Sequence, residues 1–477
     1  MDLKGEAMRI VRRAAKGAAA MAFHYTGAEE LLASVQRRAV GGRRVLILSY
    51  HRVVGNFDLE ATRSLPTLNI AQETFKKHLE TLAEDYDIVA LDRALEVLDG
   101  KSRPSRDIAV VTFDDGYRDV YDHAFPVMRD MKVPGIVYVP SAFTGTNRRI
   151  AHDRLWSALV RMKDRRLGPV SVGVPGRFES MLIDAWEGAE TPNKVLENLI
   201  SNNPTPVLYD LAAVLEDRLG LSENDGPAGQ LPMSWEMLRE MGSHGIETGA
   251  HTAEHTVLTN QPLDEARREI AQCKSVLEKG VGRPVRHFAY CNGWYSAGVA
   301  QALKGEGFVS AATTEDLPNL PGVDPFALKR KVLWENSSAG ILGVYSKAVT
   351  ACTLNDTLGT LALTRRARRT SGHRATGRRR APRPPTDSER ECTRKASCVR
   401  RGRSSSPAGR RRCSASGSRC SSSGCSIRRR SASTSRCGWS RPAPSSCCRW
   451  GSPRASTTSF HGATGTAPPT SRSPSPR

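Results

Sequence analysis

The chain has 477 residues, with 70 Lys and Arg against 49 Asp and Glu and a formal net charge of +21. A charge of that size normally indicates nucleic acid or an anionic membrane as the partner. Residues 364–477, however, contain 27 Arg, one Lys and three acidic residues, a net of +25, which leaves −4 for residues 1–363. The charge therefore excludes a generally basic protein, and residues 1–363 have the composition of an ordinary globular domain.

The C-terminal segment, residues 364–477, contains no Leu, Met, Tyr, Asn or Gln, but eight of the eleven cysteines. Such a segment cannot bury enough apolar surface to offset its ordering entropy, so we expect it to be disordered. Arg almost without Lys, among Ser, Pro, Ala and Gly, is typical of a GC-rich gene translated out of frame, which is the interpretation that we favour. The alternatives are an Arg/Ser-rich tail that binds nucleic acid and a cysteine-rich module, although the cysteine spacing follows no ligand pattern.

Residues 1–43 are basic and alanine-rich, and Lys16 interrupts their apolar part. They make a poor signal peptide and a plausible basic amphipathic helix, so the compartment stays open between the cell envelope or extracellular space and the cytoplasm. The rest of the body holds no apolar run as long as a membrane span. Its three cysteines, Cys273, Cys291 and Cys352, require no disulfide framework.

Strands and helices alternate along the body. We expect strands at 44–51, 107–113, 135–140, 246–250, 286–290 and 308–313, and helices at 75–86, 117–131, 234–242, 262–280 and 296–307. Alternation at this spacing is typical of βα units around a parallel sheet, most simply a barrel. The rhythm breaks at about 146–230, where polar helices and Gly/Pro turns indicate a helical insertion. The expected fold is therefore an α/β protein with a distorted (β/α) barrel over residues 44–350.

Polar residues follow several of these strands directly. Asp114 and Asp115 follow "VVTF", His51 follows "LILSY", and the segment "HTAEH" follows "IETGA". The carboxyl ends of parallel strands meet at one face of a barrel, where chemistry gathers. Two histidines four residues apart, His251 and His255, suit a divalent metal, and a carboxylate would complete the site.

Each of these signals has a simpler explanation when it is taken alone. The histidine pair could lie at the surface or cap a helix, and the aspartate pair could be a helix N-cap. A single His51 is more often a buried structural histidine than a catalyst. Their joint occurrence after successive strands favours one shared functional site over separate structural roles.

Together, "LSYHRVV", "TFDDGYRD", "GAHTAEH" and "FAYCNG" resemble the motifs of the polysaccharide deacetylases, the NodB-type carbohydrate esterases. The resemblance covers residues 44–333 apart from the insertion, and the motif layout is nearest to that of poly-N-acetylglucosamine deacetylases. It implies hydrolysis of acetyl groups on an N-acetylated polysaccharide or oligosaccharide with a divalent metal, most often zinc, with cobalt, manganese, nickel or iron as alternatives. It assigns the catalytic base to Asp114 and the metal ligands to Asp115, His251 and His255.

The resemblance also suggests the remaining roles. The backbone N–H of Asn292 would stabilise the oxyanion, and Tyr117, Tyr290 and Trp294 are the expected sugar-binding residues. Many members carry a general acid on a late Leu-x-His strand, but no histidine occurs between His287 and His373. Because this late histidine is missing, His51 becomes the candidate acid, as in members with an early Tyr-His.

The chain departs from the family pattern at two further positions. Ala289 stands where the family usually has an Arg that orients the base, and Arg330 could supply that cation. Cys291 stands where Pro is usual.

Three other functions stay open at this stage. The histidines and a carboxylate could hold iron in an oxygenase, the barrel could bind sugars without activity, and the tail could bind nucleic acid. We expect no nucleic-acid binding by the body, and the sequence does not fix the oligomeric state.

If residues after about 363 result from a frame error, removing them should leave activity and barrel stability unchanged and should improve solubility, because eight thiols disappear. The DNA read in a neighbouring frame should encode normal Leu, Val and acidic content. If both alternative frames are closed there, the tail is genuine, and salt-sensitive binding of the isolated tail to a polyanion is the expected result.

Overall fold

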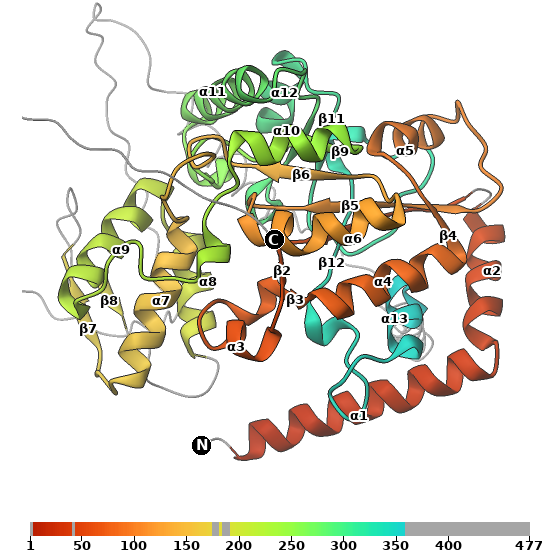
Figure 1. Ribbon diagram of the computed structural model, residues 1–477, viewed down its shortest axis with the longest axis horizontal. Coiled ribbons are helices and arrows are strands. Elements are labelled where there is room, and N and C mark those ends of the chain that lie inside the picture. The colour runs from red at the N-terminus through yellow and green to blue at the C-terminus, as the bar shows by residue number, and fades with distance from the viewer. Residues whose placement is uncertain (1–2, 41–42, 174–180, 184–190, 358–477) are drawn as a thin grey trace, which may run out of the picture. The chain divides into compact units, whose positions relative to one another are not determined.

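The structure is a computed structural model that describes residues 3–40, 43–173, 181–183 and 191–357, so the segment 364–477 lies outside the described residues (Figure 1). The helices are α1 (Leu3–Tyr25), α2 (Ala28–Val40), α3 (Phe57–Ala61), α4 (Gln72–Asp85), α5 (Leu91–Leu98), α6 (Phe125–Met131), α7 (Ala151–Asp164), α8 (Thr191–Asn202), α9 (Thr205–Leu219), α10 (Trp235–Ser243), α11 (Leu263–Val281), α12 (Ala297–Gly305) and α13 (Lys347–Leu354). The strands are β1 (Val45–Tyr50), β2 (Arg52–Val54), β3 (Asn69–Ala71), β4 (Tyr86–Ile88), β5 (Asp107–Phe113), β6 (Gly135–Val139), β7 (Val170–Val172), β8 (Met181–Ile183), β9 (Ile246–Ala250), β10 (His287–Ala289), β11 (Ser310–Ala312) and β12 (Lys331–Val332).

The central sheet is parallel, in the order β11-β10-β9-β6-β5-β1-β12, with β4 paired to the first half of β5. Its two ends approach each other through the segment before β12. Leu328 bridges to Ala312 of β11, while Lys331 and Val332 pair with Leu48 and Ser49 of β1. The predicted distorted (β/α) barrel is therefore confirmed, with a curled sheet whose ring is completed by only a single bridge.

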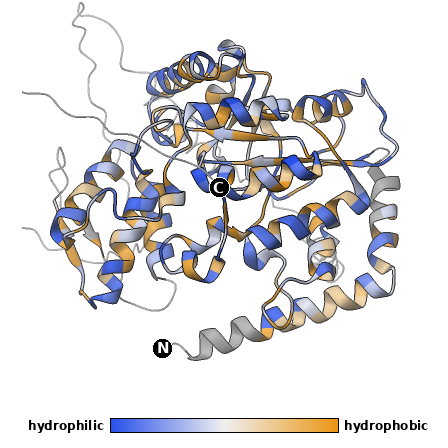
Figure 2. Cartoon of the chain, in the orientation of Figure 1, coloured by the Kyte–Doolittle hydropathy of each residue, from blue (hydrophilic) through white to orange (hydrophobic). Residues whose placement is uncertain are grey.

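Residues along the strands face two cores alternately, as the pleat requires. In β1, Val45 and Ile47 join an inner cluster that includes Tyr138, Ala289 and Leu328, whereas Leu46, Leu48 and Tyr50 join the outer cluster. The outer cluster also takes members from the other strands of the sheet and from α4, α6, α10, α11 and α12. Figure 2 shows these helices with mixed hydropathy around hydrophobic strands.

Helix α5 packs into the inner cluster through Leu91, Ala94, Val97 and Leu98, next to Val45 and Ile108 at the amino ends of their strands. It thereby covers the amino end of the barrel, and the opposite end stays available for a site.

The expected helix at 117–131 is divided in the structure. A π-helical turn spans Val120–Ala124, and α6 begins at Phe125. Pro126 explains the change, because proline has no N–H and its ring clashes with the carbonyl four residues earlier. The Phe125 N–H bonds instead to the Val120 carbonyl, five residues back.

Between β6 and α10 the chain forms α7, β7, β8, α8 and α9, which share a hydrophobic cluster of their own. These elements lie on the left in Figure 1. At the amino terminus, α1 packs on α13 through Ala20, Phe23 and Cys352. Among the described ranges, no helix has the length and apolarity that a membrane span requires.

Candidate metal and acid–base site

Asp114 is the first residue after β5 and is almost completely buried (3 % exposed). Its carboxylate receives two hydrogen bonds from Arg330, at 2.7 Å to Oδ1 and 2.8 Å to Oδ2, and a longer one from Ser49 Oγ at 3.4 Å. Burial favours the neutral acid, but the Arg330 charge more than offsets it, so the pKa of Asp114 is lowered. Asp114 is therefore ionised and fixed in orientation.

Arg330 is itself fully buried in front of β12. Its Nε donates to the Thr313 carbonyl at 2.9 Å, and its guanidinium lies 5.4 Å from the centroid of the Tyr138 ring. Thr313 follows β11 and Tyr138 belongs to β6, so Arg330 contacts two other strands of the barrel and reaches Asp114 through the barrel interior.

Asp115 points away from Asp114 and toward the histidine pair. Its Oδ1 lies 3.0 Å from His255 Nε2 and 3.4 Å from His251 Nε2. This oxygen is buried, and the angles give it no hydrogen-bond partner among the described residues. Two ligands bound to one tetrahedral zinc at about 2.0–2.1 Å lie about 3.3–3.4 Å apart. The three side chains therefore fit a divalent cation.

The electrostatics of the cluster agree with that fit. Burial opposes protonation of His255, yet the charges of Cys291 and Asp115 raise its pKa to about 10. Burial also opposes ionisation of Asp115, and the His255 charge holds its pKa well below the usual range. The pocket thus favours positive charge, which a divalent cation would supply.

Hydrogen bonds outside the cluster hold the two histidines. His251 Nδ1 donates to the Ala289 carbonyl at 2.8 Å, which leaves Nε2 as the free ligand atom. The loop that carries both histidines is anchored by Glu269 of α11, whose carboxylate accepts from the N–H groups of Ala253 and Glu254 at 2.9 and 3.0 Å.

Four residues of the site region adopt left-handed backbone conformations that are uncommon outside glycine. The φ angles are 70° at Asp115, 63° at Thr252, 54° at His255 and 56° at Asn292. Such conformations persist only where the surrounding structure enforces them, and they cluster at functional sites. Here they turn the loops after β5, β9 and β10 so that their side chains converge.

His51 follows β1 and is partly buried, and its Nδ1 has no hydrogen-bond partner among the described residues. Its charge makes a minor contribution to lowering the pKa of both Asp114 and Asp115, so it lies within electrostatic reach of the pair.

His152, near the start of α7, also enters the site, although the sequence reasoning missed it. Its Nε2 lies 2.7 Å from the Tyr117 hydroxyl and 3.9 Å from Asp115 Oδ2, and its ring lies 5.1 Å from that of His255. Burial lowers the pKa of His152. Only the adjacent His-Asp of "AHDRLW", inside the insertion, could have signalled this position, because it follows no barrel strand.

The expected sugar-binding aromatics differ in exposure. Tyr117 and Tyr290 are buried (1 % exposed), and their hydroxyls donate to Asp153 and to the Phe326 carbonyl. This placement favours structural roles for both. Trp294 is 39 % exposed and can reach a ligand. Asn292 lies in the exposed turn after β10, at the same end of the barrel as the aspartates.

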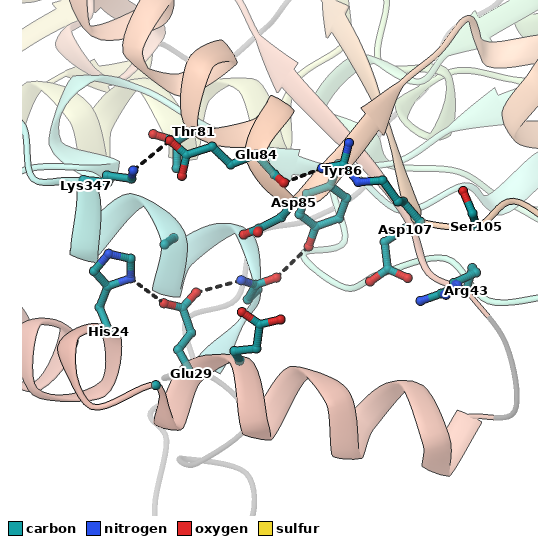
Figure 3. Close-up of a pocket in the computed structure, with 15 residues that line it drawn as sticks. His24, Glu29, Arg43, Thr81, Glu84, Asp85, Tyr86, Ser105, Asp107 and Lys347 are labelled. Carbon is teal, nitrogen blue, oxygen red and sulfur yellow. Dashed lines mark hydrogen bonds and ion pairs between the residues drawn. The ribbon is translucent and has the colours of Figure 1, made fainter.

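Two other polar clusters lie away from this end. A cavity of about 410 Å³ between α2, α4 and α13 is lined by mutually bonded side chains, with Asn355 donating to Glu29 and accepting from Tyr86, both at 2.7 Å (Figure 3). It contains no motif residue. Asp92 and His287 approach to 3.3 Å, but Arg286 already pairs with Asp92, so we interpret this group as an ion-pair cluster.

Comparison with known proteins finds similarity to one family over part of the chain. Residues 211–311 match the family model for polysaccharide deacetylases. The matched stretch includes His251, His255 and Asn292 but neither aspartate. The polysaccharide deacetylase-like protein YxkH of Bacillus subtilis (strain 168) is 23 % identical over 193 residues, which is 38 % of this chain. The chain thus spans 61 % of that relative.

Solved structures of deacetylases are also similar. IcaB from Ammonifex degensii has a TM-score of 0.42 and 20 % identity, covering 66 % of this chain and 98 % of IcaB. The Streptococcus pyogenes deacetylase PplD, in complex with acetate, has a TM-score of 0.41 and 14 % identity, covering 63 % and 96 %. The family match over residues 211–311 agrees with the resemblance that the motifs indicate, which is a similarity to the polysaccharide deacetylases.

The Asp114–Arg330 pair makes a prediction about stability. Arg330→Met should lower the free energy of unfolding by about 3–5 kcal/mol, because Asp114 is then buried without a partner. Since the pKa of Asp114 is lowered in the folded state, the loss of stability should be fully present above the unfolded pKa of about 4. It should shrink as the pH falls below that value and through the lowered pKa of the folded state. Chemical denaturation at several pH values measures both effects.

The matched control is Arg286→Met, which breaks an exposed pair and should cost less than about 1 kcal/mol. The double variant Asp114→Asn/Arg330→Met should recover part of the loss. If Arg330→Met unfolds like the wild type at neutral pH, the pair does not hold Asp114 as described.

Proposed function

We propose that this homologue of the polysaccharide deacetylases is a metal-dependent hydrolase that removes acetyl groups from an N-acetylated polysaccharide or oligosaccharide. One observation carries the proposal: two adjacent buried carboxylates have separate cationic partners. Asp114 pairs with Arg330, and Asp115 faces the Nε2 atoms of His251 and His255. This division supports a role for Asp114 in proton transfer and a role for Asp115 in binding a cation.

Asp115, His251 and His255 would hold the cation, with zinc as the first candidate and cobalt, manganese, nickel or iron as alternatives. When bound, such an ion lowers the pKa of water toward neutrality and polarises a carbonyl group. Carboxylate and imidazole donors, with one position left open, are the donor set that this chemistry requires.

Asp114 acts as the general base in this proposal. Its lowered pKa keeps it ionised at neutral pH, so it can accept the proton of the attacking water. Arg330 acts through Asp114 as a positioning residue, because its two hydrogen bonds fix the plane of the carboxylate. The backbone N–H of Asn292 would donate to the negative oxygen that develops on the acetyl group.

The departing amide nitrogen needs a proton, and we assign that proton to His51. Its unpartnered Nδ1 and its electrostatic effect on both aspartates support the assignment. His152 is the less suitable donor, because its Nε2 already bonds to the hydroxyl of Tyr117. Trp294, which is exposed, is the candidate contact for the sugar ring.

The direct test is acetate release from chito-oligosaccharides and from poly-N-acetylglucosamine, with and without a chelator, followed by addition of single metals. Activity that the chelator abolishes and one metal restores supports the proposal. Sugar binding without acetate release under all metal conditions would identify a binding protein instead.

Replacing one proposed ligand should remove metal and activity together. For His255→Ala we expect loss of bound metal in elemental analysis and at least a hundredfold fall in turnover, because only two protein ligands remain. His244→Ala, at the exposed end of α10, is the matched control and should change neither quantity. Stoichiometric metal and full turnover in His255→Ala would show that the metal site is misassigned.

His51→Ala separates proton donation from metal binding. We expect normal metal content, a loss of about 10²–10⁴-fold on N-acetyl substrates, and a much smaller loss on acetyl esters with good leaving groups, which depart without protonation. An equal loss on both substrate types contradicts the role of general acid and indicates a structural or ligand role.

A further inference from the structure

Cys291 lies in the turn after β10 and is 1 % exposed. A ligand atom from each of Cys291, His251 and His255 lies within 4.8 Å of the other two. Among the described residues, the other hydrogen-bond contacts of the thiol are two long ones of 3.6 Å, to the His251 carbonyl and the Thr252 hydroxyl. The sulfur therefore faces the same space as the two histidine rings.

The backbone fixes Cys291 in this position. Gly293 follows with φ 74°, and a Cβ there would meet Thr314 Oγ1 at 2.2 Å and its backbone N at 2.5 Å. The turn is thus packed directly against the residues after β11. On the other side, Thr252 contacts the sulfur and also accepts a hydrogen bond from the Thr256 N–H at 2.7 Å. The cysteine and the histidine loop form one packed unit.

A second observation points to a cation at this place. Asp115 Oδ1 is buried and has no hydrogen-bond partner among the described residues, and it faces the Nε2 atoms of both histidines. Four potential donors from three loops, one of them a carboxylate oxygen without a hydrogen bond, therefore surround the same space.

We propose that Cys291 supplies a fourth protein ligand, a thiolate, to the metal held by Asp115, His251 and His255. The inference rests on the metal site of the proposed function and goes beyond it. Around a tetrahedral zinc, with Zn–S about 2.3 Å and Zn–N about 2.0–2.1 Å, sulfur and nitrogen lie about 3.6 Å apart.

Binding converts the thiol to a thiolate: the S–H bond breaks, the proton passes to solvent and a metal–sulfur bond forms. A thiolate is a soft ligand and selects zinc over harder ions such as manganese. Four protein ligands also characterise closed sites, whereas catalytic sites keep one position open. The thiolate would therefore make the resting site more zinc-selective than three ligands alone would, and the water that the proposed function needs would have to bind as a fifth ligand.

Cobalt(II) titration of the metal-free, reduced full-length protein tests this inference without an activity measurement. We expect an intense near-ultraviolet sulfur-to-cobalt charge-transfer band in the wild type, and its loss in Cys291→Ser and Cys291→Ala. Zinc affinity, measured by competition with a chelator, should fall at least tenfold in both variants, and the preference for zinc over manganese should narrow.

Cys352→Ser is the matched control, because Cys352 is equally buried but lies on α13, where it packs against Ala20 of α1. It should keep both the band and the affinity. The difference between the wild-type and Cys291→Ser spectra removes any background from the cysteines of the tail, which both proteins contain. A Cys291→Ser variant with an unchanged band and an affinity within twofold of wild type overturns the inference. If, in that case, the wild type still binds one cobalt ion and His255→Ala loses it, the metal site of the proposed function stands without the cysteine. If the wild type binds no cobalt at this site, the result overturns both the proposed metal site and the role of Cys291.

Discussion

Asp114 and Arg330 are 216 residues apart in the chain and meet in the barrel interior, where both are almost completely buried. A buried carboxylate or guanidinium without a partner costs several kcal/mol, so neither residue is tolerated there alone. Arg330 also bonds to the Thr313 carbonyl after β11 and precedes β12, which pairs with β1. Arg330 therefore orients Asp114 and also bonds to the strand end next to the Leu328–Ala312 bridge, where the two edges of the curled sheet meet. One buried side chain thus links the geometry of the site to the closure of the barrel.

The same pair explains how two aspartates can be adjacent. Like charges side by side repel unless each has its own compensation. The left-handed backbone of Asp115, φ 70°, directs its carboxylate toward the histidines, while Asp114 is directed toward Arg330. Gly116 continues the turn with φ 65°, and a Cβ there would meet Val139 at 3.1 Å. The backbone after β5 thus separates two roles that the sequence places in consecutive residues.

The sequence predicted the strand–helix rhythm and the residues after β1, β5 and β9, because these follow local periodicity and short motifs. Arg330 could be suggested only because Ala289 occupies the position where the family has a cation. His152 and Glu269 were not identified. Each reaches the site from a helix through tertiary packing, with no motif around it. The π-helical turn before Pro126 was missed for a different reason, since helical periodicity outweighed the single proline signal.

The insertion contributes to the site as well as to its own core. Asp153 accepts from the Tyr117 hydroxyl at 2.9 Å and from Gln230 Nε2 at 3.0 Å, and Gln230 in turn accepts from Arg149. This buried network joins the start of α7 to the turn after β5 and to the segment before α10. Because α7 begins at that junction, His152 is held next to Asp115 by the same contacts. A change in the packing of α7 would therefore act directly, through Tyr117, on the candidate site around Asp115, and not only on access to it.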